Sequence, residues 1–413
     1  MPIYDLAVAG AGLGGLATAA LLARHNKRAV LVDPAPVVGG ALSSVRKGGF
    51  VYSPGPSLSF GFERGGALQD LCSELGISQN ASVHSPCYQV ALPDRRISVF
   101  RETGETLEEL RREFPREIDA IARFYQDLRK ASERTSKSRF SAYWSRRRKT
   151  GHFFRGYRFS REFRTFLDIP ALYFFQQSAA ELSLSNLIML FDTAPLSLHE
   201  GFQQLCDHLL AVILKNGGEI RHGEPHPDIS QSNGEARGLA LSSGSFLESA
   251  TVLVNAPLKP ALTTVFLGVR DEVIPVGMSR EVLCLPDYGR PDLVHAFSIS
   301  TRENEDAARR NTKALTVSFP FLPQGKERIE TLMTLISGTI PFLGRFLVTV
   351  ETQGPGPDAA ALPSNVSPKA LSDSLGKSLL CKTSVKHLYV LPDDPRSPLR
   401  AVSAARELAG RLL

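Results

Sequence analysis

Residues 4–33, which read YDLAVAGAGLGGLATAALLARHNKRAVLVD, decide the fold of this chain. The apolar run from Tyr4 to Val8 predicts a buried strand, the glycine-rich stretch GAGLGG follows it, and residues 16–24 have the composition of a helix. A second apolar strand runs from Ala29 to Val32 and ends on Asp33. A GxGxxG motif is a weak signal alone, but in this strand, helix and strand context it predicts a dinucleotide-binding fold.

Each glycine of the motif has an expected role at a bound dinucleotide. Gly10 permits the tight turn, Gly12 lets the backbone approach the pyrophosphate, and Gly15 lets the helix pack closely on the sheet. Leu13 and Gly14 stand at the start of the helix, where free N–H groups and partial positive charge attract phosphates. We therefore predict that residues 10–15, here called the glycine loop, hold a diphosphate.

A carboxylate and a second glycine pair come after the first helix. Asp33 lies 18 residues after Gly15, about where a carboxylate reaches the hydroxyls of the adenosine ribose. Its negative charge disfavours a 2′-phosphate, so NADP is not expected. The chain continues as PAPVVGGALSSVRKGGFVYSPGPSLSF, in which Gly39 and Gly40 let it turn back beneath the first helix.

The order of glycine loop, acid, VGG, GGF and GPS turn is similar to that of flavoproteins in the amine oxidase superfamily. The GPS turn, residues 55–57, points to the phytoene desaturase side of that superfamily. The resemblance implies FAD, because NAD-linked Rossmann enzymes lack the second glycine pair and the GPS turn. Beyond the glycine loop and Asp33, it implies cofactor contacts from Pro34, Gly39, Gly40, Ala41, Gly55, Pro56, His226 and Asp393.

The same resemblance implies an α/β fold, with a Rossmann-type FAD-binding domain of the GR2-like flavoprotein kind and an interleaved α+β substrate domain. We assign residues 1–82, 196–258 and 364–413 to the FAD-binding domain, and residues 83–195 and 259–363 to the substrate domain. Residues 106–132 predict a long helix whose apolar stripe is typical of core. Pro115 marks a kink or a break in it.

Three departures from the family pattern lie near the expected phosphates and adenine. Ala41 stands where the family usually has an arginine that contacts the flavin phosphates. Ser53 and Pro54 stand where Asp-Ala usually precedes the GPS turn, and His226 occupies the place at which a valine backbone meets adenine. These differences bear on function.

The fourth departure lies at the C-terminal end, where Gly-Asp is replaced by Pro392-Asp393. The glycines that normally follow give way to a stretch containing Pro395 and Pro398, which have no N–H to donate to the flavin. Asp393 can still accept hydrogen bonds from ribityl hydroxyls, and Pro398 suits the first turn of a helix. We expect altered redox tuning, and a noncatalytic descendant remains an alternative.

The charge of the chain is uneven. The formal net charge is +6, and residues 129–164 hold 13 Lys and Arg against two acids, a net charge of +11 that leaves the rest at −5. This basic segment also contains aromatic residues, including Trp144, the only tryptophan, a mixture that suits a membrane interface. A solvated basic face is the plainer interpretation. The segment lacks the pattern of a recognised nucleic-acid helix, so no nucleic-acid partner is expected.

Several site classes are excluded by what the sequence lacks. The five cysteines are scattered, without the spacing of a disulfide framework or a zinc site, so no metal is expected. No run reaches the about 18 apolar residues of a membrane span. No signal peptide precedes the first strand, and we expect a cytoplasmic protein that associates with membranes through the basic segment.

These patterns favour an FAD-dependent oxidoreductase of the desaturase or dehydrogenase type, acting on an apolar, isoprenoid-like substrate at the membrane surface. A degenerate flavoprotein-like accessory protein and an amine oxidase remain alternatives. The aromatic run FRTFLDIPALYFF, residues 163–175, lines a substrate tunnel or belongs to the core. His199 and His295 are candidate bases, but each is more often structural, and we assign no catalytic residue.

Overall fold

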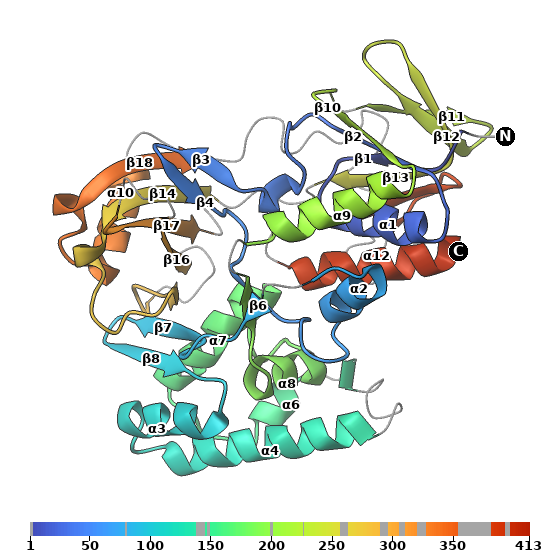
Figure 1. Cartoon of the computed structure of the whole chain (residues 1–413). Coiled ribbons are helices and arrows are strands. Elements are labelled where there is room, and N and C mark those ends of the chain that lie inside the picture. Colours follow the sequence, from blue (N-terminus) through green and yellow to red (C-terminus); the bar gives the residue numbers. More distant parts are fainter. Residues whose placement is uncertain are drawn as a thin grey trace.

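The computed structural model of the protein forms two large sheets and a layer of helices (Figure 1). In the view of Figure 1, the N-terminal sheet and its helices lie on the right, the second sheet on the left and the helical layer below. The structure describes residues 3–78, 81–137, 145–146, 149–198, 201–225, 227–256, 263–289, 296–304, 310–319, 328–353, 381–392 and 397–413.

The first sheet has a parallel centre in the order β10-β2-β1-β13, and β20 pairs with the far part of β13. An antiparallel hairpin of β11 and β12 extends from the near part of β13, and β19 pairs with β20. The strands are β1 (Tyr4–Ala9), β2 (Ala29–Asp33), β10 (Glu219–His222), β11 (Asp228–Ser232), β12 (Glu235–Ala240), β13 (Phe246–Ala256), β19 (Cys381–Lys382) and β20 (Leu388–Pro392).

Helices cover one face of this sheet because alternate strand residues are apolar toward it. On that face, Leu6, Leu31 and Leu391 form one cluster with the helices. On the opposite face, Ala7 and Val30 pack with the β11–β12 hairpin. The helices are α1 (Leu13–Arg24), α2 (Ala67–Leu75), α9 (Gln203–Lys215) and α12 (Pro398–Leu412). Pro398 is the first residue of α12, as predicted.

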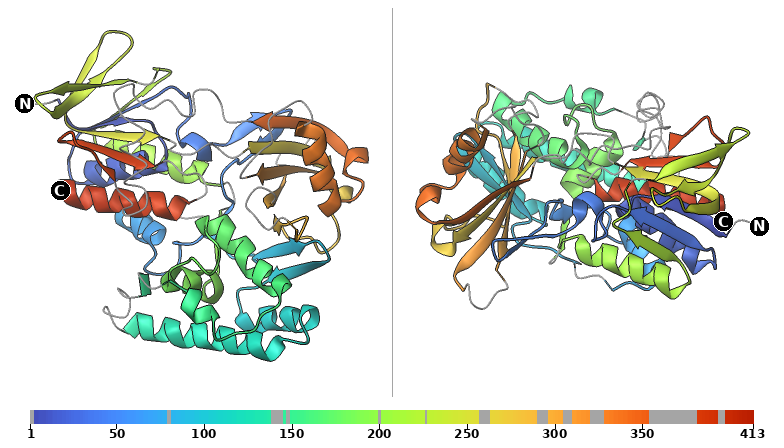
Figure 2. Two further views of the ribbon diagram at one scale, coloured as in Figure 1. Left: turned by 180° about the vertical axis from the view of Figure 1, so that it is seen from behind. Right: turned by 90° about the horizontal axis from the view of Figure 1, so that it is seen from above.

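The second sheet has the order β18-β14-β17-β16-β15-β7-β8 and is antiparallel apart from the β15–β7 pair. One of its faces packs on α10 (Arg328–Thr339). Figure 2, seen from above, shows the two large sheets at opposite ends of the molecule. The strands are β7 (Tyr88–Leu92), β8 (Arg95–Val99), β14 (Thr263–Arg270), β15 (Glu281–Cys284), β16 (Phe297–Glu303), β17 (Thr312–Phe319) and β18 (Leu347–Gln353).

The helical layer contains the predicted long helix as two helices. α3 (Thr103–Glu113) and α4 (Ile118–Lys137) are separated at Pro115, so the proline is a break. The apolar stripe is core: Leu110 and Ile121 are fully buried. Further helices in the layer are α6 (Gly151–Phe154), α7 (Arg161–Phe175) and α8 (Leu184–Asp192).

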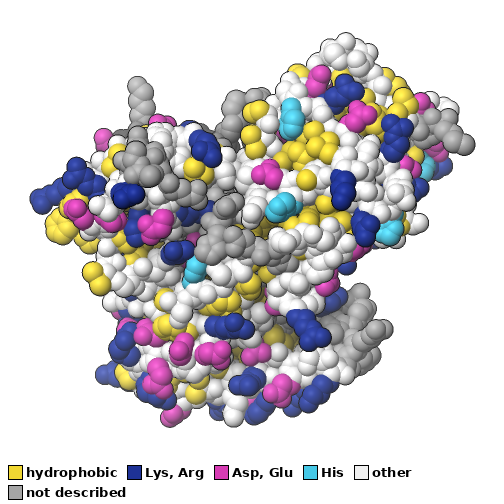
Figure 3. All heavy atoms as spheres, viewed as in Figure 1, with side chains coloured by type: hydrophobic (Ala, Val, Ile, Leu, Met, Phe, Trp, Pro, Cys, Tyr) yellow, Lys and Arg dark blue, Asp and Glu magenta, His cyan; other side chains and the backbone are white. Residues whose placement is uncertain are grey.

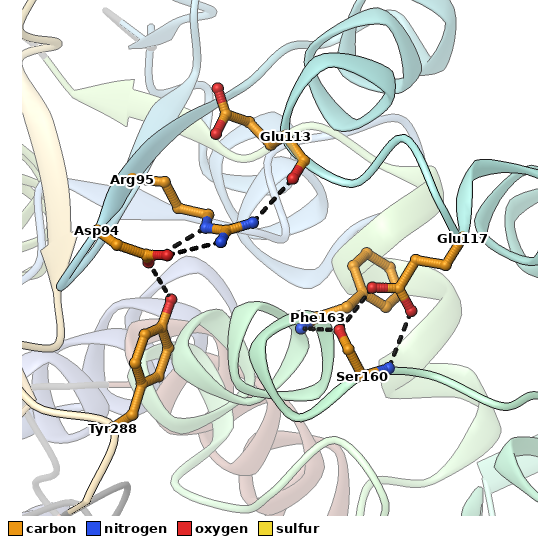
Figure 4. A network of polar contacts seen from close by, with 7 residues as sticks. All are labelled: Asp94, Arg95, Glu113, Glu117, Ser160, Phe163 and Tyr288. Atoms are coloured by element: carbon orange, nitrogen blue, oxygen red, sulfur yellow. Dashed lines mark hydrogen bonds and ion pairs between the residues drawn. The ribbon is translucent and has the colours of Figure 1, made fainter.

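The start of α7 is fixed to the loop before α4 (Figure 4). The Ser160 hydroxyl accepts a hydrogen bond from the N–H of Phe163 at 3.1 Å and so caps α7. Glu117 in turn accepts from the Ser160 N–H at 2.9 Å and from its hydroxyl at 2.5 Å. In the same view, Asp94 pairs with Arg95 and accepts from the hydroxyl of Tyr288.

Short strands link the two large sheets. They are β3 (Val45–Lys47) with β4 (Phe50–Tyr52), and β9 (Leu196–Leu198) between β5 (Leu58–Ser59) and β6 (Ala81–Ser82). The mixed α/β architecture predicted from the sequence is confirmed. The strands of the first sheet come from residues 4–33, 219–256 and 381–392, and the domain boundaries given above stay a prediction.

Candidate functional site

The glycine loop turns sharply between β1 and α1. Gly10 has φ +99°, and its N–H donates to the Val32 carbonyl at 2.8 Å. A Cβ atom added to Gly10 would lie 2.1 Å from the carbonyl oxygen of Asn255 in β13. Only glycine fits this position, because both the backbone conformation and the neighbouring strand exclude a side chain.

The two predicted glycine pairs lie next to each other in space. Gly12 is the N-cap of α1 and forms a parallel bridge with Gly39, whose N–H donates to the Ala11 carbonyl at 2.8 Å. Gly39 has φ +112°, and Gly40 begins the turn that follows it. The segment at residues 39–41 therefore runs along the start of α1, where the cofactor phosphates are predicted to bind.

Asp33 lies at the end of β2 beside the glycine loop, and its side chain is almost buried. One carboxylate oxygen accepts from the Ala11 N–H at 2.5 Å and the other from the Ala35 N–H at 2.8 Å. Each oxygen has a second lone pair for a ribose hydroxyl. Asp33 thus orders the loop itself, and its predicted contact with ribose stays a prediction, as does that of its exposed neighbour Pro34.

Asn255 is a site residue that our sequence analysis missed. Its side chain, 4% exposed, accepts from the Gly15 N–H at 2.9 Å and donates to the Leu391 carbonyl at 3.2 Å. It therefore joins the glycine loop to β13 and β20, the three segments expected to form one cofactor site. The sequence holds only a weak signal, a polar residue directly after the short apolar run of residues 252–254 in β13.

The GPS turn reaches both the cofactor side and the second sheet. A Cβ atom on Gly55 would lie 2.4 Å from a methyl group of Leu42, just after Gly40 and Ala41. Gly55 and Pro56 also line the cavity described below. His226, Asp393, His199, His295 and Trp144 lie outside the described residues, so the predictions made for them are not examined by this structure.

These features fit a bound FAD. The diphosphate would meet the N-terminus of α1 and the backbone of the glycine loop, where a side chain at Gly10 is sterically excluded. Asp33 lies within the same group of residues, and Gly55 and Pro56 lead from it toward the second sheet. The individual contacts remain predictions, but the residues needed for them are brought together.

A cavity that is open to solvent lies between the GPS turn, α7 and the second sheet. We call it the central cavity. Apolar residues supply much of its wall, among them Ile169, Leu172 and Leu283, so part of the aromatic run in α7 faces a cavity. The rest of that run, including Phe163 and Phe166, is core. The run is therefore partly core and partly cavity wall, and the substrate tunnel stays a prediction.

One wall of the central cavity consists of hydroxyl groups. We call Ser298, Ser300, Thr316 and Ser318 the hydroxyl wall; all four line the cavity. Ser298 pairs with Ser318, and Ser300 pairs with Thr316, across β16 and β17. The alternate residues, such as Ile299 and Val317, pack on the other face of the sheet in the cluster with α10.

Glu281 adjoins this wall from β15 and was also missed. Its side chain is 3% exposed, it stands opposite Ser300, and it accepts a hydrogen bond from that hydroxyl at 2.9 Å. Burial raises the pKa of Glu281 to about 7, although Ser57, Ser300 and two arginines favour its charged form. An isolated acid in the apolar stretch EVLCL was the only sequence signal.

We predict that Glu281→Gln changes how stability depends on pH. Because folding raises the pKa of Glu281 from 4.5 to about 7, the folded state binds the proton more tightly than the unfolded state. The contribution of Glu281 to the free energy of unfolding therefore falls as the pH rises from 4.5 to 7, by at most about 3 kcal/mol. When urea unfolding of both proteins is measured across this range, Glu281→Gln should gain stability relative to wild type as the pH rises. If the free energies of unfolding of the two proteins change in parallel with pH, the buried and protonated carboxyl of Glu281 is contradicted.

Three comparisons bear on this site. Residues 13–281 match the family model described as flavin containing amine oxidoreductase. The 4,4'-diapophytoene desaturase (4,4'-diapolycopene-forming) of Methylomonas sp is 24% identical over 407 residues, which cover 90% of this chain and 78% of that protein. Prolycopene isomerase 2 of an Oncidium hybrid cultivar is 32% identical over 133 residues, which cover 30% of this chain and 22% of that isomerase.

A solved structure agrees on the fold. The crystal structure of an oxidoreductase from Methanosarcina mazei matches with a TM-score of 0.65 at 17% identity, and the match covers 97% of this chain and 99% of the other. The family model alone spans more than half of the 413 residues and includes the second half of the glycine loop, Asp33, the GPS turn and Glu281. On these grounds the chain belongs to the flavin-containing amine oxidoreductase family, on its phytoene desaturase-like side, and is an FAD-dependent oxidoreductase.

Proposed function

We propose that this enzyme dehydrogenates an apolar, isoprenoid-like substrate in the manner of a desaturase. The observation that carries the proposal is the central cavity, which is open, is lined largely by apolar residues apart from the hydroxyl wall, and adjoins the GPS turn on the way from the predicted cofactor site. A relative that matches over most of both chains is named as a diapophytoene desaturase, which supports the same class of substrate.

In such a reaction the cofactor and the residues of the central cavity would have different roles. Bound FAD supplies the hydride acceptor, while the protein supplies the pocket, orientation and electrostatics. Ile169, Leu172 and Leu283 would hold a hydrocarbon chain by apolar contact and exclude water from it. The network that caps α7 at Ser160 would keep two of these residues in place.

We predict that Leu172→Trp blocks turnover by filling the central cavity. FAD-loaded protein mixed without oxygen with phytoene or diapophytoene in liposomes should lose its oxidised flavin absorbance, and the variant should do so at least about 100-fold more slowly. Leu214→Trp is the matched control, because Leu214 is 47% exposed on α9. If neither probe reduces the flavin in the wild-type protein, the proposed substrate class is wrong.

We further propose that the basic segment brings the enzyme to an anionic membrane surface by charge. Its described cations are all exposed; they are Arg129, Lys130, Arg134, Lys137, Arg146, Lys149, Arg155, Arg158, Arg161 and Arg164. Of its aromatic residues, Tyr157 and Phe159 are buried against Phe124, whereas Trp144 lies outside the described residues, so an aromatic contribution stays a prediction. In Figure 3, acidic side chains lie among the basic ones on the lower part of the molecule, so that face is not uniformly basic.

We predict that the double variant Arg155→Glu and Arg158→Glu weakens binding to liposomes containing phosphatidylserine by about 30-fold at low salt. Each cation near such a surface contributes about 1 kcal/mol, and the attraction falls as salt screens it. The control exchanges two exposed cations on helices that cover the first sheet, Arg24→Glu in α1 and Lys215→Glu in α9. Sedimentation with liposomes measures both. Equal binding by both double variants would exclude the basic segment as the attachment surface.

The described part of the chain contains no helix that is both long and apolar enough to cross a bilayer.

A further inference from the structure

We propose that the hydroxyl wall binds a single oxygen atom carried by an otherwise apolar substrate, and that Glu281 acts as a positioning residue that sets the direction of the hydrogen bonds to it. The substrate class would thus be an isoprenoid-like alcohol or ketone. The inference deepens the proposed function by naming a polar group on its apolar substrate, but binding to the wall can be tested without turnover.

The arrangement of the second sheet places these groups in one row. Glu281 stands opposite Ser300 on β16, and Ser300 stands opposite Thr316 on β17, so the three side chains follow one another across the sheet. The neighbouring row runs through Leu283, Ser298 and Ser318 and also lines the cavity. A carboxyl group therefore lies at one end of a continuous line of hydroxyls.

A pure hydrocarbon can occupy the cavity but leaves this wall without hydrogen-bond partners, so it should bind more weakly than an analogue that carries an oxygen. The lining includes the four hydroxyls of the wall, together with Ser57 of the GPS turn and Tyr173 of α7. A ligand without polar atoms would remove water from these groups and replace none of the lost hydrogen bonds, which costs free energy. A site built around hydrogen-bonding groups discriminates strongly against analogues that lack the matching polar atom. An oxygen on the ligand would satisfy part of the wall.

Glu281 is surrounded by groups whose hydrogen bonds depend on its protonation state and which also line the cavity. Ser300 donates to it, Ser57 lies beside it from the GPS turn, and Tyr173 of α7 interacts with both Glu281 and Ser57. The charged groups that act on it are Arg302 of β16 and Arg280, the residue before it. Three of these neighbours, Ser57, Ser300 and Tyr173, line the central cavity directly.

The state of Glu281 determines what the hydroxyls can offer. An ionised carboxylate only accepts, so neighbouring hydroxyls donate to it and present their lone pairs to the ligand, which favours an alcohol. A protonated carboxyl donates one hydrogen bond, which frees a hydroxyl hydrogen for the ligand and favours a carbonyl. The preference for alcohol over ketone should therefore increase as the pH rises through about 7, where Glu281 loses its proton.

The test uses four matched probes: geranylacetone, the alcohol made by reducing its carbonyl, the amine with the same skeleton and the corresponding hydrocarbon. Binding of each to FAD-loaded protein is measured by equilibrium dialysis from about pH 5 to about pH 9. We expect the oxygen-bearing probes to bind at least about 10-fold more tightly than the hydrocarbon. We also expect the ratio of alcohol to ketone affinity to rise about 10-fold across the range.

Variants separate positioning from a merely structural role. Glu281→Gln should keep the preference for oxygen but lose its pH dependence, and Ser300→Ala should reduce the preference for oxygen itself. Ser249→Ala, a buried serine of β13 that donates to the Thr251 carbonyl, is the matched control and should change neither. Unfolding curves of each variant establish that it is folded before binding is compared.

Three results would overturn the inference. They are equal binding of hydrocarbon and alcohol, an unchanged pH profile in folded Glu281→Gln, and tightest binding of the amine, which would make Glu281 a counter-ion. The FAD content of the same samples is read from their absorbance. Failure to hold FAD counts against the proposed oxidoreductase site, whereas the probe preferences count only for or against the hydroxyl wall.

Discussion

Replacing Gly10 by alanine is expected to abolish FAD binding and to lower the free energy of unfolding by about 4 kcal/mol. The new Cβ would lie 2.1 Å from the Asn255 carbonyl oxygen, a backbone atom in the middle of the first sheet that cannot move aside cheaply. The residue would also adopt φ +99°, which side chains other than hydrogen rarely tolerate. Guanidinium unfolding and the flavin absorbance of the purified protein measure the two effects.

Two other glycines separate the clash from general effects of alanine. Gly76 ends α2 with φ +67° and open space around it, so Gly76→Ala should cost only about 1 kcal/mol from backbone strain. Gly104 lies in α3 with open space and no positive φ, so Gly104→Ala should stabilise the protein slightly. If Gly10→Ala lowers the free energy of unfolding no more than Gly76→Ala does, the close contact of Gly10 with β13 is wrong.

Replacing Asn255 by alanine is expected to cost about 3 kcal/mol of stability and to weaken FAD binding by at least about 10-fold. The change leaves the Gly15 N–H and the Leu391 carbonyl without the side-chain partners that they have now, both in a buried place. Asn255 also holds the start of α1 against two strands, so the predicted diphosphate site should become less ordered. Denaturant unfolding and titration with FAD measure the change.

Asn216→Ala provides the control for Asn255. The Asn216 side chain also hydrogen bonds to a carbonyl, that of Val212, but only within the last turn of α9 and only partly buried. Its loss should cost less than about 1 kcal/mol. Similar unfolding midpoints for the two variants would contradict a special role of Asn255 at the joint between the glycine loop and the strands.

Local patterns were sufficient to predict the elements of the first sheet. The apolar runs that became β1 and β2 are bounded by glycines and an acid, and the helix predicted over residues 16–24 lies within α1. The stripe of α3 and α4 was predicted as core for the same reason, because its spacing places one face inward. Each of these features is encoded within about 20 consecutive residues.

Asn255 and Glu281 could not be predicted as site residues because their partners are distant in the sequence. Asn255 meets Gly15 across 240 positions, and Glu281 meets Ser300 only through the register of β15 and β16. A shift of one residue in that register would turn Glu281 to the opposite face of the sheet. Sequence patterns give the strands, but the pairing that fixes such neighbours is a property of the folded chain.

The aromatic residues of the basic segment show the opposite limitation. Their mixture with arginines predicted rings at a membrane surface, yet Tyr157 and Phe159 point inward and pack against Phe124. Composition does not say which side of a short helix or loop faces the core. The cations remained exposed because burying unpaired charge is costly, so the electrostatic part of the membrane hypothesis is retained, while the part that depends on Trp144 stays a prediction.

The absorption spectrum of the purified protein after dialysis against FAD tests the central claim most directly. The account predicts a yellow protein with about one flavin per chain, and a colourless Gly10→Ala preparation under the same conditions. A folded wild-type protein that stays colourless after this treatment would contradict the account, because the glycine loop, the tip of α1 and Asp33 would then form no cofactor site.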